Sequence, residues 1–71
     1  LNLEWSTLQD GEYNISIVDI FGREIYLEKV FVSKNKVLRK NIALPEIAPG
    51  VYFLRIGNGE FSESRKFTVG Y

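Results

Sequence analysis

The chain has 71 residues, of which 45% are hydrophobic, and nine Lys and Arg balance nine Asp and Glu to a formal net charge of zero. This length fits a single domain whose core leaves little room for a deep enzyme cleft. The sequence contains no His and no Cys, which removes the commonest general base and metal ligand together with disulfides and thiolate nucleophiles. We therefore expect no enzyme, no cofactor and no metal site. The longest apolar run, 51–54, is too short for a membrane span.

Strand patterns begin at the first residue. Leu1, Leu3 and Trp5 alternate with polar residues, and a period of two places their side chains on one face of a strand. A second alternation covers 13–18, where Tyr13 and the two isoleucines that follow at odd positions are predicted to be buried. Further runs rich in β-branched or aromatic residues lie at 25–32, 37–42, 51–56 and 61–69.

Turn residues separate these runs at 10–11, 21–22, 33–36, 49–50 and 57–59. Glycine supplies the positive φ that hairpin turns require. No stretch has a convincing 3.6-residue period. The least strand-like connection, 41–48, contains Pro45, which resists a helix interior, so we predict that it crosses between two sheets.

The stretch 44–52 is the most informative about the fold. A leucine at the end of a strand, a Pro-Gly turn and Tyr52 two residues after Gly50 resemble the tyrosine corner of Greek-key sandwiches, whose phenol bonds to upstream backbone. Gly11 and Tyr13 repeat this spacing, which fits two strands obeying one rule better than a duplication. The predicted fold is all-β: a small immunoglobulin-like antiparallel β-sandwich with Greek-key features.

Charge is uneven along the chain although its sum is zero. Acidic residues predominate in 1–23, whereas the middle of the chain carries Lys29, Lys34, Lys36, Arg39 and Lys40. A basic loop suggests an anionic partner, such as nucleic acid on an OB-like barrel. Because 34–40 lacks the interleaved aromatic residues on which single strands stack, a solvated hairpin is the preferred interpretation and no nucleic-acid partner is expected.

Two carboxylate pairs flank predicted turns, Asp10 with Glu12 and Asp19 with Glu24. Paired carboxylates are suited to acid–base catalysis, but turn carboxylates more often accept backbone hydrogen bonds. A very small enzyme using Asp19 or Glu24 is a distant hypothesis, since it requires a cleft with a perturbed carboxylate.

Three ordered motifs resemble a known family. They are Asp-Ile-Phe-Gly-Arg at 19–23, Pro-Gly-Val-Tyr-Phe-Leu-Arg at 49–55 and Arg-Lys-Phe-Thr-Val at 65–69. In this order and spacing they resemble the type A C-terminal sorting domain of the type IX secretion system, which cargo proteins of one Gram-negative phylum carry. The resemblance extends over nearly the whole chain.

The resemblance implies a non-catalytic signal that directs a parent protein through an outer-membrane translocon, after which a sortase-like cysteine protease at the surface removes it. The implied location is secreted or cell surface, reached via the periplasm. Residues 1–71 would then be one C-terminal sorting domain, a fragment of a larger protein that lacks the start of its first strand, with the cleavage site upstream of Leu1. Family members usually open with an Asn-Pro pair, which is absent here.

Carried over position by position, the family motifs fall on Asp19, Gly22, Arg23, Gly50, Tyr52 and Lys66. The resemblance implies that the two glycines shape turns and that the tyrosine anchors the corner. Arg23 and Lys66 would present cations to the secretion machinery.

The alternative is a fibronectin-like or carbohydrate-binding accessory module. It requires solvent-facing aromatic residues in a flat row, for which the candidates are Trp5, Tyr26, Phe61 and Tyr71. Some of the aromatic residues, Phe31 and Phe53 included, cannot share one buried face and would form a patch for a protein or a sugar. An unpaired edge strand would in addition permit a weak homodimer.

Overall fold

The computed structural model describes residues 1–59 and 61–70. Its secondary structure consists of six strands, β1 (Asn2–Ser6), β2 (Gly11–Asp19), β3 (Glu24–Val32), β4 (Val37–Asn41), β5 (Gly50–Gly57) and β6 (Ser62–Val69). Each predicted strand is present, with ends that differ by a few residues at most. Within the described residues, no helix is long and apolar enough to cross a membrane.

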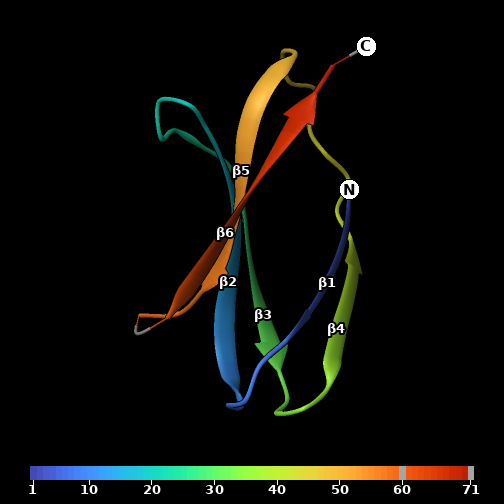
Figure 1. The fold of residues 1–71 in the computed structure, drawn as a ribbon, viewed down its shortest axis with the longest axis vertical. Helices are drawn as coiled ribbons and strands as arrows, with labels where there is room; N and C mark the ends of the chain where they lie inside the picture. Colours follow the sequence, from blue (N-terminus) through green and yellow to red (C-terminus); the bar gives the residue numbers. More distant parts are fainter. Residues whose placement is uncertain (60, 71) are drawn as a thin grey trace.

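The strands form two antiparallel sheets that pack face to face (Figure 1). One sheet contains β1 and β4, and the other has the order β3-β2-β5-β6. After leaving the larger sheet at the end of β3, the chain passes through β4 and returns with β5 beside β2, which is a Greek-key connection. The all-β sandwich predicted from the sequence is confirmed.

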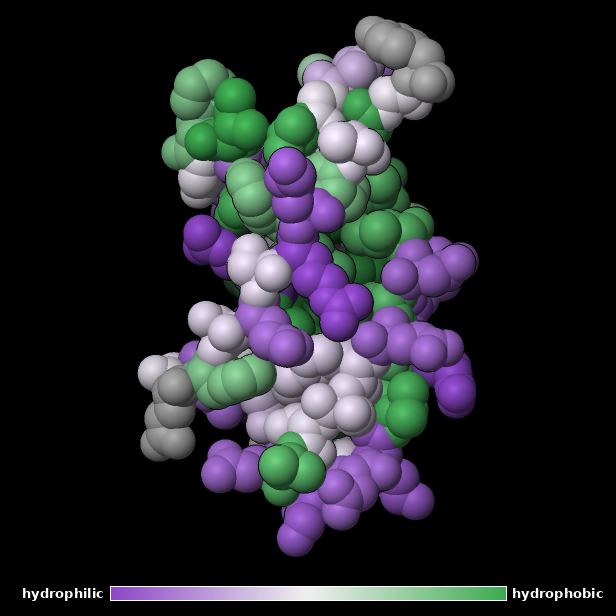
Figure 2. All heavy atoms as spheres, in the orientation of Figure 1, coloured by the Kyte–Doolittle hydropathy of each residue, from purple (hydrophilic) through white to green (hydrophobic). Residues whose placement is uncertain are grey.

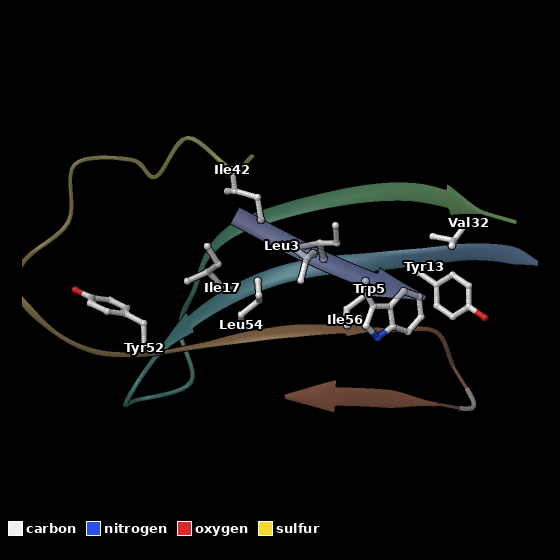
Figure 3. Packing of buried hydrophobic residues seen from close by; sticks show 10 residues of the cluster. Leu3, Trp5, Tyr13, Ile17, Val32, Ile42, Tyr52, Leu54 and Ile56 are labelled. Carbon is white, nitrogen blue, oxygen red and sulfur yellow. The ribbon is translucent and has the colours of Figure 1, made fainter. Parts of the chain in front are cut away.

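The core lies between the two sheets and draws on both (Figure 3). As predicted, Tyr13, Ile15 and Ile17 of β2 are buried, the two isoleucines fully. Val18, which the alternation assigned to the opposite face, is also buried, and the register of β2 with β3 shifts between Ile17 and Val18. Leu3 and Trp5 of β1 cover the two isoleucines from the smaller sheet. Leu1, expected on the same buried face, is instead 36% exposed and lies just before the first residue of β1.

The connection from β4 to β5 crosses between the sheets, as predicted, and contributes to the core. Ile42 is fully buried, and Leu44 and Ile47 pack against the same cluster. The Ile42 amide donates to the carbonyl of Leu1 at 2.7 Å, which extends the pairing of β1 with β4 by one step. This connection is therefore part of the packed fold.

A polar cluster links the two sheets where β3 faces β4. The Tyr26 hydroxyl donates to the carboxylate of Glu28, which also forms an ion pair with Lys40. The hydrogen bonds from Lys40 and Tyr26 hold the pKa of Glu28 below its ordinary value, and the bond to Glu28 raises the pKa of Tyr26. A carboxylate on the inner face of β3 is thus satisfied by groups from both sheets.

Candidate functional site

The three sequence motifs meet at one end of the four-stranded sheet, formed by 19–23, 50–53 and 66–69, which we call the motif end. The register pairs Asp19 of β2 with Tyr52 of β5, and Tyr52 in turn with Phe67 of β6. Lys66 lies opposite Phe53 in the next pair. Antiparallel pairing of β2, β5 and β6 thus brings distant segments of the chain side by side.

The β2–β3 turn is organised by the side chain of Asp19. Its Oδ1 accepts hydrogen bonds from the amides of Phe21 and Arg23, both at 2.9 Å, and its Oδ2 accepts one from Arg23 Nε at 2.7 Å. The Gly22 amide also donates to the Asp19 carbonyl at 3.0 Å. Gly22 has a φ of 81°, in the left-handed region that favours glycine. Asp19, Gly22 and Arg23 therefore form one self-contained turn.

The charges of Asp19 and Arg23 compensate each other. The Asp19 side chain is 12% exposed and that of Arg23 75%. Burial by itself raises the pKa of Asp19, but hydrogen bonds from Arg23 and Phe21, together with the positive charge of Arg23, outweigh it and hold this pKa below its ordinary value of 3.8. The Arg23 guanidinium also lies over the ring of Phe21, 5.6 Å from its centroid. Arg23 is thus engaged within its own turn.

Tyr52 closes the other side of the motif end. Its ring is buried and stacks on Phe67 with centroids 6.0 Å apart. Its hydroxyl donates to the carbonyl of Ala48, which is the upstream backbone bond expected of a tyrosine corner. Gly50, two residues earlier, has a φ of 157°, a value that other residues rarely adopt. The sequence pattern thus predicted this local geometry.

Lys66 lies on the exposed edge strand β6. It faces away from the core together with Phe53, its partner in the register. None of the ion pairs within the described part of the chain involves Lys66. That it presents a cation to a partner stays a prediction.

The opposite end of the sandwich contains a hollow of about 440 Å³ between β1 and β6. Trp5, which is buried in the core, contributes to its lining, and its Nε1 donates to the carboxylate of Glu63. The Phe61 ring packs against Trp5 in a tilted arrangement, with centroids 6.3 Å apart. Because Trp5 faces the core and Tyr26 is half-buried, these two residues do not form the flat solvent-facing row of the carbohydrate-binding alternative. Tyr71, the last candidate for that row, lies outside the described residues.

Two of the turn carboxylates accept hydrogen bonds from backbone amides. Asp10 accepts a hydrogen bond from the amide of Lys34, and Asp19 accepts two from its own turn. Glu24, the other residue of the enzyme hypothesis, is exposed at the start of β3. Within 1–59 and 61–70, no three acidic side chains lie close enough together to hold a metal ion. Asp10 and Asp19 are thus placed as structural acceptors.

Gly57 and Tyr13 have structural roles that the sequence indicated only in part. A Cβ added to Gly57 would lie 2.2 Å from the Phe61 carbonyl oxygen and 2.6 Å from Ser62 Cα, so only glycine fits there. Tyr13 forms a second tyrosine corner, since its hydroxyl donates to the Gln9 carbonyl at 3.0 Å. The repeated Gly-x-Tyr spacing was the signal for the Tyr13 corner. The turn at 57–59 was predicted, but the close approach of Phe61 and Ser62 to Gly57 was not.

Comparison with known proteins gives one result. The family model described as "Secretion system C-terminal sorting domain" matches residues 1–70. Neither the curated proteins nor the solved structures give a significant match. The family match covers the three motifs that meet at the motif end and confirms the resemblance found in the sequence. The chain belongs to the family of secretion system C-terminal sorting domains, the type IX signals that lead proteins toward the cell surface or the extracellular space.

Proposed function

We propose that this domain is a non-catalytic signal that brings its parent protein to the outer-membrane translocon of the type IX system. A sortase-like cysteine protease then removes it from the parent at the cell surface, after passage through the periplasm. The observation that carries the proposal is the convergence of the three family motifs at the motif end. A single partner surface would contact all three there.

The chemistry of the side chains supports a recognition role over a catalytic one. Asp19 is ionised and fully used by its turn, with hydrogen bonds from Phe21 and Arg23. A general acid at neutral pH requires a raised pKa, whereas the pKa of Asp19 is lowered. The domain then acts by being folded and bound.

The test is export of a reporter. Residues 1–71 are fused to the C-terminus of a periplasmic reporter and expressed in a strain with an active type IX system and in a matched strain lacking its translocon. We expect the reporter in the medium or on the cell surface only in the first strain. Retention in the periplasm while an authentic sorting domain is exported would contradict the proposal.

Lys66 provides a residue-level version of this test. Lys66→Ala is expected to reduce export, and Lys29→Ala, which changes an exposed lysine of β3 outside the three motifs, serves as the matched control. Both substitutions change a surface position, so free energies of unfolding within about 0.5 kcal/mol of that of the unchanged domain are expected. Equal export of the two variants would remove Lys66 from the recognised surface.

A further inference from the structure

The tip of the β2–β3 hairpin presents two large apolar side chains to solvent. Ile20 is 63% exposed and Phe21 78% exposed. The turn extends beyond the neighbouring strands at the upper left of Figure 1, and Figure 2 shows a hydrophobic cluster at the same place. Neither residue belongs to the core cluster or packs against it. The fold therefore gains little from their apolar character.

Hydrogen bonds and a ring contact constrain the exposed tip. Asp19 fixes the amides of Phe21 and Arg23, and the Arg23 guanidinium covers one face of the Phe21 ring. Gly22 permits the left-handed step that closes the turn. An aromatic side chain on a rigid support loses little conformational freedom when it binds, and such residues carry much of the energy of protein interfaces.

The local charge favours a protein pocket over a lipid surface. Asp19 and Arg23 form an ion pair at 2.7 Å, and Glu24 follows directly, so the hairpin tip carries no excess of basic residues. Segments that lie on anionic membranes combine apolar side chains with several Lys or Arg. A concave apolar pocket on a protein fits this tip better.

We propose that Phe21 and Ile20 insert into an apolar pocket of a protein of the secretion machinery, and that Asp19 and Arg23 are positioning residues for this tip. The inference rests on the proposed function, because it names the contact by which the signal is recognised. It gives Arg23 a different part from the presented cation that the family resemblance implied.

The first experiment compares exposed apolar residues at the two ends of the domain. Phe21→Ser and Ile20→Ser are tested in the reporter fusion beside Leu8→Ser, which alters a residue that is 80% exposed and far from the motif end. Thermal unfolding of all three should match that of the unchanged domain. We expect export to fall about tenfold or more for Phe21→Ser, as for an interface anchor, and to stay unchanged for Leu8→Ser.

The outcomes separate this inference from the proposed function. If the unchanged fusion is not exported, the proposed function fails. If it is exported and Phe21→Ser is exported equally well, only the inference about the tip fails. Phe21-dependent flotation with vesicles of phosphatidylethanolamine and phosphatidylglycerol, or a Phe21-dependent dimer in sedimentation, would also overturn it in favour of a lipid surface or a second copy.

Arg23 is tested by a conservative replacement. Arg23→Lys keeps the charge but loses the planar group that bonds Asp19 through Nε and covers Phe21. As a positioning residue, Arg23 should not be replaceable by Lys, so Arg23→Lys and Arg23→Gln should reduce export alike and shift the Phe21 amide resonance. Full export of Arg23→Lys with none for Arg23→Gln would instead identify a presented cation.

Discussion

The same Gly-x-Tyr corner is built at both ends of the sandwich, and the two corners differ in their neighbours. Tyr13 and Tyr52 each follow a glycine by two residues, and each hydroxyl donates to the carbonyl four residues upstream. Because β2 and β5 are antiparallel, the two rings lie at opposite ends of the core (Figure 3). The same hydrogen bond from tyrosine to upstream backbone is thus present at both ends of the larger sheet.

The difference lies in what each corner is attached to. Tyr13 contacts Thr7 Oγ1 at 3.0 Å and packs edge-on against Trp5 at 5.0 Å, so it ties the larger sheet to β1. Tyr52 stacks on Phe67 of the neighbouring strand and stands opposite Asp19 in the register. The Tyr13 corner joins the two sheets, whereas the Tyr52 corner supports the surface that carries the family motifs.

The largest loss of stability is expected at Gly57, which is paired with Asn14 next to the Tyr13 corner. In Gly57→Ala the new Cβ meets the Phe61 carbonyl and Ser62 Cα, so the β5–β6 turn must move. We expect a loss of about 3 kcal/mol, which is most of the stability of so small a domain. Gly59→Ala is the control, because a Cβ there meets nothing within 4 Å. Urea unfolding measures both, and equal stability of the two variants would show that the turn relaxes freely.

The two corner glycines should differ in their tolerance of a side chain. A Cβ at Gly11 or Gly50 lies about equally far from the following tyrosine ring, at 3.8 and 3.9 Å. Only Gly50 has a positive φ, so Gly50→Ala should cost about 1 to 3 kcal/mol and Gly11→Ala no more than about 0.5 kcal/mol. Similar unfolding midpoints for the two variants would mean that backbone strain does not distinguish the corners.

Removing each hydroxyl compares the corners directly. Tyr52→Phe loses one hydrogen bond, for which we expect about 1 kcal/mol. Tyr13→Phe loses the bond to Gln9 and the contact with Thr7, and should cost up to about 2 kcal/mol. Chemical denaturation of both variants is the measurement. A larger loss for Tyr52→Phe would reverse the view that the Tyr13 corner is the more strongly attached.

The smallest effect is a dependence on pH at the motif end. The pKa of Asp19 is lower in the folded chain than its ordinary value of 3.8, so the ionised carboxyl stabilises the fold above that value. This stability is lost as the pH falls through the folded-state pKa. Asn at position 19 cannot titrate, so the stability difference between the unchanged domain and Asp19→Asn should shrink in acid. Unfolding midpoints from about pH 6 to about pH 2 measure it, and a constant difference would contradict the prediction.

The strands were predictable from sequence because each is encoded locally. The alternation of apolar and polar residues predicted the burial of Tyr13, Ile15 and Ile17 on β2, and turn glycines marked the ends of the runs. The exposure of Leu1 was not predictable in this way, since alternation assigns a residue to a face but does not show how much of that face is covered. The pairing of β1 with β4 and of β2 with β5 also lay beyond local patterns, because it depends on contacts between distant segments.

The sequence predicted the family and the geometry of one corner, but not the spatial arrangement of the motifs. The order of the motifs identified the family, and the Pro-Gly-Val-Tyr run predicted the bond from Tyr52 to upstream backbone. The ion pair of Asp19 with Arg23 and the exposure of Phe21 became apparent only from the three-dimensional structure of the turn. Apolar residues inside a turn have no periodicity that would indicate whether they face the core or solvent.

The pairing of β1 with β4 has a consequence for the order in which the domain forms. Asn2 is paired with Asn41, so the first strand has no partner until more than half of the chain is available, whereas β2–β3 and β5–β6 are hairpins of consecutive strands. Non-local pairings are slow because the loops between them must close first. We therefore expect the hairpin capped by Asp19 to form before the non-local pairings of β1 with β4 and of β2 with β5. Trp5 fluorescence should report the step at which β1 packs on the core.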